Sequence, residues 1–201
     1  MNANSSNDKK IRLFIAAKIP PELKEALRKQ QDKVRLEMEG SEDYKKSDIS
    51  WTNLEQAHLT IKFLGETPEQ NIPNISEALK RATKDIKAFE VVTSKIGAFP
   101  TIKIPKLIWV GIKENSHLEK LHDRVVGELS INTAKEKRFT PHLTICRVKD
   151  KRASKTLYEK LQDMRNLTFS GLNFTASELV LFKSELKAEG AIHTALLRIK
   201  I

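Results

Sequence analysis

The chain has 201 residues, which is enough to bury a core as one domain or as two small lobes. Lysine and arginine number 36 against 26 acidic residues, and this formal charge of +10 favours polyanionic partners such as RNA or nucleotide phosphates. Cys146 is the only cysteine, which excludes an intramolecular disulfide and indicates a reducing compartment, so we expect a cytoplasmic protein.

The N-terminal region begins with a polar segment. Residues 1–10 lack the apolar core of a signal peptide and are predicted to form a flexible tail, ahead of a single domain over 11–201. No later stretch approaches ~20 consecutive apolar residues, so we expect no membrane-spanning segment. Residues 12–18 are typical of a buried strand, and Pro20–Glu22 opens a helix whose apolar residues recur on one face.

The next segments alternate between loop, strand and helix. Residues 39–48 are polar and charged, which predicts a mobile loop. Residues 57–64 form a predicted strand that ends at Gly65. Thr67–Gln70 has the pattern of a capping box with Pro68 at the first helical position, although Pro73 can move the helix start downstream.

The second half of the chain repeats this alternation. Ser116 and Glu119 form a second capping box, which predicts a helix after a pair of strands. A charged helix is expected over residues 154–164. The predicted strands of this half are residues 89–96, 106–113, 141–148, 168–174, 178–184 and 192–201. This alternation of strands and helices indicates an α+β fold with two similar lobes of antiparallel sheet plus helices.

One tetrapeptide occurs twice, at His58–Ile61 and at His142–Ile145, and both copies read His-Leu-Thr-Ile. For two of only five histidines to share their next three residues by chance is improbable, roughly one in several hundred. Alternate residues of a strand share a face, so each copy places an imidazole and a hydroxyl side by side. A single copy would be ordinary strand chemistry, whereas two copies favour a functional pair.

Strict alternation also assigns the neighbouring side chains to faces. Lys62 falls on the face of His58 and Thr60, where its charge could neutralise a phosphate, or it is a solvated lysine at a strand end. Cys146 falls on the face of His142. Arg147 falls on the opposite face, so its contribution beside His142 requires a β-bulge or the end of the strand.

The segments around the two tetrapeptides resemble the 2H phosphoesterase family, and within it the RNA 2′,3′-cyclic phosphodiesterases, also called 2′-5′ RNA ligases. The similarity extends over residues 11–201 and includes segments outside the two motifs. These segments are Arg12–Ala16, Gly97–Pro100, Leu107–Gly111, Phe139–Pro141 and Ser184–Leu186. The resemblance implies two pseudo-symmetric lobes around a central cleft, with one motif strand from each lobe lining it.

The resemblance also implies roles for individual residues. His58 would donate a proton to the leaving 3′-oxygen of an RNA 2′,3′-cyclic phosphate, and His142 would accept a proton from water. Thr60 and Thr144 would hold the phosphate oxygens, because their hydroxyls share the faces of the histidines. Arg147 stands where the family carries a basic residue.

Phe139 could stack on a base or pack in the core. His117, His122 and His193 have only structural interpretations, although His193 stands where the family more often carries an aromatic residue.

The chemistry expected from the sequence needs no cofactor. Two histidines are too few ligands for a metal site, and no phosphate-binding glycine-rich loop is present, so ATP-driven ligation is not supported. We expect a monomeric, metal-independent hydrolase of RNA 2′,3′-cyclic phosphate ends, with possible reversible 2′-5′ ligation. The alternatives are a 2H phosphodiesterase acting on 2′,5′-oligonucleotides or small cyclic nucleotides, and a non-catalytic RNA-binding module.

Overall fold

The computed structural model describes residues 9–42, 44–129, 138–163, 172–187 and 190–201. Its strands form two antiparallel sheets. The four-stranded sheet has the order β3-β1-β8-β9, from His58–Pro68, Lys10–Lys18, Glu178–Lys187 and Gly190–Lys200. The five-stranded sheet has the order β2-β6-β5-β4-β7, from Ile49–Trp51, His142–Val148, Ile104–Ile112, Phe89–Thr101 and Asn173–Ala176.

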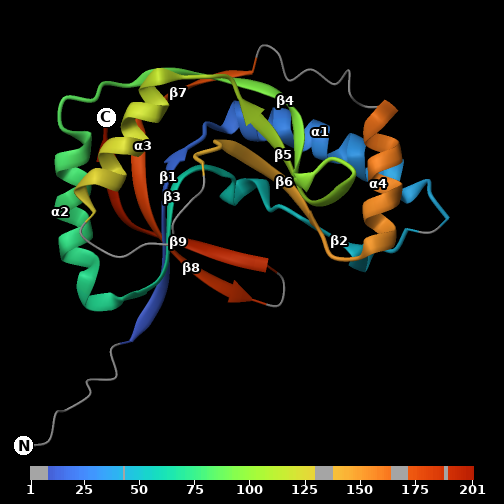
Figure 1. Ribbon diagram of the computed structural model, residues 1–201, viewed down its shortest axis with the longest axis horizontal. Coiled ribbons are helices and arrows are strands. Elements are labelled where there is room, and N and C mark those ends of the chain that lie inside the picture. Colours follow the sequence, from blue (N-terminus) through green and yellow to red (C-terminus); the bar gives the residue numbers. More distant parts are fainter. Residues whose placement is uncertain (1–8, 43, 130–137, 164–171, 188–189) are drawn as a thin grey trace, which may run out of the picture.

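Two helices pack on each sheet. Helices α2 and α3 contact the four-stranded sheet, and α1 and α4 contact the five-stranded sheet. Figure 1 shows these two pairs on opposite flanks of the molecule. The α-helices are α1 (Pro21–Glu39), α2 (Ile72–Thr83), α3 (Ser116–Glu128) and α4 (Lys151–Asp163), and the short 3-10 helices are η1 (Lys46–Asp48), η2 (Leu54–Gln56) and η3 (Glu69–Asn71).

The two sheets and their helices are the two lobes, so the predicted α+β fold is confirmed. The lobes are not halves of the sequence, because β1 and β3 pair with each other and β1 also pairs with β8, near the opposite end of the chain. Helix α1 follows β1 but packs against β6 in the other lobe. The motif strands β3 and β6 contact each other where the lobes meet.

Alternating apolar residues build the core beneath both motif strands. Leu59 and Ile61 of β3 and Leu143 and Ile145 of β6 are fully buried. They pack in a single cluster with apolar residues of the helices, such as Leu27. The motif strands are therefore held rigidly from behind, which fixes the direction of their histidines.

Several element boundaries differ from the sequence prediction. The capping box at Thr67 is wrong, because β3 continues to Pro68 and α2 begins at Ile72, with Pro73 in its first turn. Thr67 is buried, and its hydroxyl donates to the Gly65 carbonyl. The cap of α3 is Asn115 rather than Ser116, since its side-chain oxygen accepts from the Leu118 N–H.

Other differences concern loops and the chain ends. The predicted loop over residues 39–48 contains η1, whose Asp48 is buried and accepts a hydrogen bond from the Lys45 N–H. Helix α4 begins at Lys151, three residues earlier than predicted. Strand β1 begins at Lys10, inside the predicted tail, and residues 1–8 and most of the predicted strand 168–174 lie outside the described residues. Within the described residues no helix is long and apolar enough to cross a membrane.

Candidate active site

His58 is the first residue of β3, and its ring is fixed by the backbone just before it. Ala57 is extended, with ψ at 139°, which brings the Gln56 carbonyl beneath the ring. The distance between His58 Nδ1 and this oxygen is 2.8 Å. A carbonyl can only accept a hydrogen bond, so Nδ1 carries the hydrogen and Nε2 is left as the basic nitrogen.

His142 repeats this arrangement at the start of β6. Its Nδ1 lies 2.7 Å from the carbonyl oxygen of Thr140, again two residues earlier in the chain. The tautomer is therefore the same in both rings, and both present Nε2 for proton transfer. The repeated tetrapeptide produces a repeated local geometry.

The charge of His142 acts on the His58 ring across the contact between the lobes. Burial is the main cause that lowers the pKa of His58 to about 4, and charge on His193 and His142 lowers it further. The pKa of His142 is also lowered, first by burial and then by the positive charge of Arg147. Without a bound anion, both rings are therefore neutral near pH 7.

Both motif strands contain a β-bulge at the isoleucine of the tetrapeptide. Against β1, Thr60 pairs with Ala16 and Lys62 pairs with Ile15, which leaves Ile61 without a partner of its own.

The bulge in β6 has the same form. Against β5, Thr144 pairs with Trp109 and Cys146 pairs with Ile108, which leaves Ile145 without a partner of its own. A bulge of this kind shifts the side chains that directly follow it to the other face of the strand.

The bulge in β6 brings Arg147 to the face of His142. Arg147 pairs with Leu107, on the same face as the pair formed by Thr144 and Trp109. The bulge that Arg147 needed to reach the face of His142 is therefore present in β6. Its charge acts on His142, whose pKa it lowers.

The same bulges overturn two predictions made from strict alternation. Lys62 does not share the face of His58; it pairs with the core residue Ile15 and is only 4% exposed, so it is not a solvated lysine either. Cys146 does not share the face of His142; it is fully buried, and burial raises the pKa of its thiol to about 12. A cysteine nucleophile is thus also unsuited to this position.

Phe63 takes the place on the His58 face that alternation had given to Lys62. It pairs with Phe14, whose ring lies 4.6 Å from the His58 ring, and it is 50% exposed. Phe139, by contrast, stacks on His122 at 4.1 Å between ring centroids and packs against the core. The structure therefore favours the packing interpretation of Phe139.

His193 is an unexpected member of the site. It lies in β9, and its ring meets that of His58 edge-on at 5.2 Å between centroids. Its backbone N–H donates to the side-chain oxygen of Gln56, the residue whose carbonyl orients His58. His193 thus links β9 to the segment that positions the first catalytic candidate.

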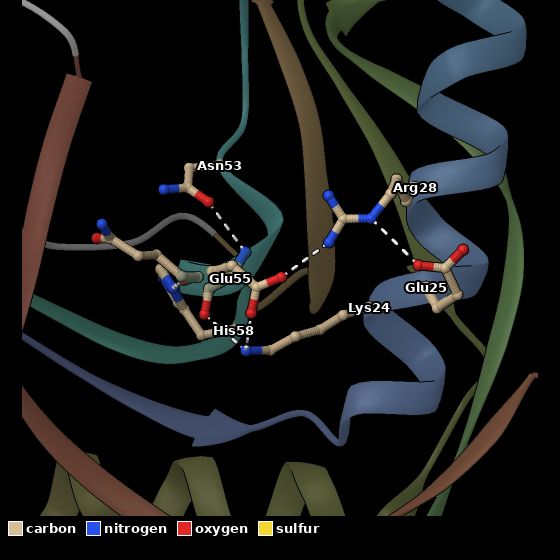
Figure 2. A network of polar contacts seen from close by, with 7 residues as sticks. Lys24, Glu25, Arg28, Asn53, Glu55 and His58 are labelled. Atoms are coloured by element: carbon tan, nitrogen blue, oxygen red, sulfur yellow. Dashed lines mark hydrogen bonds and ion pairs between the residues drawn. The ribbon is translucent and has the colours of Figure 1, made fainter.

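A polar network holds η2, which carries Gln56, against the start of α1 (Figure 2). Asn53 caps η2 by accepting from the Glu55 N–H. The ammonium of Lys24 donates to the Glu55 carbonyl oxygen at 2.6 Å, and Arg28 pairs with the Glu55 carboxylate at 2.8 Å. The turn before His58 is therefore tied to α1 at several atoms.

A pocket of about 200 Å³ adjoins His58 on the four-stranded sheet. The residues that line it include Phe182, His193 and the cations Lys18, Lys24 and Arg198. Among the described residues no group of three or more His, Cys, Asp or Glu side chains is arranged to hold a metal ion.

Comparison with known proteins places this site in a family. A profile of the 2′-5′ RNA ligase superfamily matches residues 19–188. The chain belongs to this family. The RNA 2′,3′-cyclic phosphodiesterase of Methanocaldococcus jannaschii is 30% identical over 184 residues, which cover 91% of this chain and 96% of the relative. That of Thermotoga maritima is 32% identical over 151 residues, covering 73% of this chain and 76% of the relative.

Solved structures agree with the family assignment. A crystal structure of a Thermus thermophilus protein matches with a TM-score of 0.73 and 25% identity, covering 94% of this chain and 97% of that one. Escherichia coli LigT, crystallised with phosphate, matches with a TM-score of 0.66 and 18% identity over 96% and 98% of the two chains, which shows a shared fold. The resemblance to 2H phosphoesterases that the sequence indicated is confirmed.

For this member of the superfamily, the residues that sequence reasoning missed are the ones that position the histidines. Gln56 and Thr140 act through backbone carbonyls, which any residue type supplies, so no side-chain pattern marks them. Their only signal is their common spacing, two residues before each histidine. His193 was detectable as a departure from the family pattern, but its contact with His58 depends on the pairing of β8 with β9.

Proposed function

We propose that this chain is an RNA 2′,3′-cyclic phosphodiesterase that hydrolyses the terminal cyclic phosphate to a 2′-phosphate without a metal ion. The observation that carries the proposal is the matched pair of imidazoles, each with Nδ1 bonded to a carbonyl two residues earlier. The names of the Methanocaldococcus and Thermotoga relatives support the same substrate. Both imidazoles come from one chain, so we propose that it acts as a monomer.

In the proposed mechanism, the two histidines act on opposite sides of phosphorus. His142 Nε2 takes a proton from water, whose oxygen attacks phosphorus, while protonated His58 gives its proton to the ribose 3′-oxygen. The bond from phosphorus to the 3′-oxygen breaks and the bond to the 2′-oxygen stays. The hydroxyls of Thr60 and Thr144 donate to the non-bridging oxygens as negative charge develops there.

The lowered pKa of His58 is compatible with the donor role. A bound phosphate places negative charge beside the ring, which raises the pKa of His58 and stabilises its protonated form. Burial at the same time makes the imidazolium a strong acid, so it transfers its proton readily to the leaving oxygen. Arg147 assists by adding positive charge on the His142 side of the phosphate.

The same groups account for a ligase activity. If the 5′-hydroxyl of another RNA end replaces water, His142 takes its proton and the product is a 2′-5′ phosphodiester. We propose that this reaction accompanies hydrolysis at high concentrations of RNA ends. The single, buried cysteine supports a reducing compartment, and we propose the cytoplasm.

The proposal is tested with an oligonucleotide that ends in a 2′,3′-cyclic phosphate, incubated in EDTA. We expect full activity and a product with its phosphate on the 2′-oxygen. Loss of activity in EDTA would overturn the metal-free mechanism, and a 3′-phosphate product would reverse the assignment of the leaving oxygen.

The histidine variants separate catalysis from binding. We expect His58→Ala and His142→Ala each to abolish turnover, while the RNA dissociation constant stays within several-fold of wild type, because neither neutral ring dominates the electrostatic attraction. Near-normal turnover in either variant would remove that histidine from the mechanism. In the same assays, 2′,5′-linked oligonucleotides and small cyclic nucleotides as the better substrates would identify a different 2H activity.

A further inference from the structure

The pocket beside His58 lies on the same face of the four-stranded sheet as the catalytic candidates. Lys18 pairs directly with His58 across β1 and β3, which places both side chains on one face. Phe182 and Arg198 reach this face from β8 and β9, since Phe182 pairs with Phe14, whose ring contacts His58. The pocket is therefore a continuation of the active site, bounded by this face of the sheet and by Lys24 at the start of α1.

The pocket carries an excess of positive charge. Among the described residues that line it, the only carboxylate is that of Glu55, which is already paired with Arg28 and lies 3.7 Å from the Lys24 ammonium. Arg198 is paired with Glu178, at 2.9 Å, while Lys18 is exposed and makes no ion pair with any residue that the structure describes. Lys18 is thus the cation best placed to receive an anion here.

The direction of the reaction decides which part of a substrate reaches this pocket. In the function proposed above, His58 protonates the ribose 3′-oxygen and water attacks from the His142 side. The ribose therefore lies on the His58 side of phosphorus, together with everything bonded to its 5′-carbon. In RNA the group on that carbon is the next phosphate of the chain.

We propose that the pocket binds the phosphate on the 5′ side of the reacting ribose, with Lys18 as its principal cation and Arg198 as the second. The inference rests on the proposed function and names its substrate class: RNA ends with at least two nucleotides, rather than cyclic mononucleotides with a free 5′-hydroxyl. A mononucleotide of that kind has a single phosphate, which lies between the histidines and provides no second anion for Lys18.

The test compares three substrates that share one base: a 2′,3′-cyclic mononucleotide with a 5′-hydroxyl, the same molecule with a 5′-phosphate, and the dinucleotide with a cyclic phosphate end. In wild type we expect the 5′-phosphate to raise kcat/KM about tenfold, as charge-assisted hydrogen bonds to a phosphate typically allow. An equal gain with the dinucleotide indicates recognition of the phosphate alone, and a larger gain assigns the site to the RNA chain.

The variants assign the gain to Lys18. We expect Lys18→Ala to reduce the ratio of kcat/KM between the two mononucleotides to about one, and Lys18→Arg to restore it. Lys10→Ala is the matched control, because Lys10 is an exposed lysine at the other end of β1 and pairs with Pro68. The control is expected to keep the wild-type ratio.

The outcomes distinguish a failure of the proposed 5′-phosphate site from a failure of the proposed hydrolase function. If wild type hydrolyses the 5′-hydroxyl and 5′-phosphate substrates equally well, the pocket does not bind this phosphate and the inference is wrong, while the proposed function stands. If Lys18→Ala lowers kcat/KM for all three substrates by the same factor, Lys18 does not act on the 5′-phosphate, and the inference is again wrong. If none of the three is hydrolysed, the proposed function itself fails.

Discussion

Neutral imidazoles at both motif positions set the pH dependence of this site. Catalysis by one acid and one base needs one ring protonated and the other neutral. Burial lowers the pKa of His58 to about 4, so its protonated form, the donor, becomes scarce as the pH rises above that value. The pKa of His142 is also lowered by burial, which favours its neutral form. At neutral pH, only a small fraction of the free enzyme therefore has the His58 ring protonated and ready to donate.

We predict that kcat/KM falls about tenfold per pH unit between pH 7 and pH 8, because it reports the free enzyme. The falling limb of kcat should lie at higher pH, since the bound phosphate raises the pKa of the donor. Initial rates measured from about pH 4 to pH 9 give the pH dependence of both kcat/KM and kcat. A kcat/KM that is flat or rising from pH 7 to pH 8 would contradict the lowered pKa values.

Arg147 gives a second prediction at this scale. Arg147→Ala removes a positive charge beside His142, so the pKa of His142 should rise, as measured by NMR titration of its ring. We also expect kcat/KM to fall roughly 10- to 100-fold, as for loss of one group that stabilises transition-state charge. Lys149→Ala, at an exposed lysine just beyond β6, is the control. An unchanged His142 pKa in Arg147→Ala would show that the two groups do not interact.

At the scale of elements, the bulges decide which side chains reach the site. A strand with period two accommodates His58, Thr60 and Lys62 on one face, so the sequence of β3 gave no reason to expect an interruption. In β6 the adjacent apolar residues Ile145 and Cys146 were a visible break in alternation. The motif histidines and threonines were predictable because they precede the bulge, and Lys62 and Cys146 were misplaced because they follow it.

The exact first residue of a helix is also hard to predict from local sequence. Ser116 and Asn115 are both good caps, and local sequence does not decide between them; in the structure Asn115 also donates from its side chain to the Glu90 carbonyl of β4. That second bond depends on the tertiary fold. Element types were therefore predictable, while exact positions depended on contacts distant in the sequence.

Gln31 of α1 connects the bulge of β6 to the approach to β3. Its side-chain nitrogen donates to the Ile145 carbonyl at 3.0 Å and to the Thr52 carbonyl at 2.9 Å, and Gln31 is 5% exposed. The Thr52 N–H also donates to the Ile145 carbonyl. The carbonyl of the bulged residue therefore accepts two hydrogen bonds, one from the Gln31 side chain and one from the Thr52 backbone. Helix α1 thereby holds the bulge of β6 and the segment that leaves β2.

We predict that Gln31→Ala destabilises the fold by about 1–3 kcal/mol, because the Thr52 carbonyl loses its bond to Gln31 and the Ile145 carbonyl keeps only the Thr52 N–H. Urea unfolding measures this loss. Because the bulge places Arg147, we also expect kcat to fall more than KM rises. Lys33→Ala, at an exposed position of the same helix, should change neither quantity. A Gln31→Ala variant with wild-type kcat would show that the bulge persists without the amide.

At the scale of the whole molecule, the lobes are built from interleaved parts of the chain. The four-stranded sheet needs β1 and β3 from one end of the sequence and β8 and β9 from the other. Helix α1 lies between β1 and β3 in sequence but belongs to the five-stranded sheet. Neither lobe is a continuous segment, so the lobes are not expected to fold independently.

This arrangement predicts one cooperative unfolding transition. Both tryptophans, Trp51 and Trp109, lie in β2 and β5 of the five-stranded sheet, so fluorescence reports on that lobe alone. Far-ultraviolet circular dichroism reports on both lobes. The two signals should give the same denaturation midpoint, and separate midpoints would show that the lobes unfold independently.

The pairing of β1 with β8 has a consequence for synthesis on the ribosome. His58 is translated long before the strand that completes its sheet and the histidine that packs against its ring. Until those segments emerge, a nascent chain carries the first motif without a formed site around it. Hydrolytic competence therefore arises only after β8 and β9 have left the exit tunnel and β8 has paired with β1.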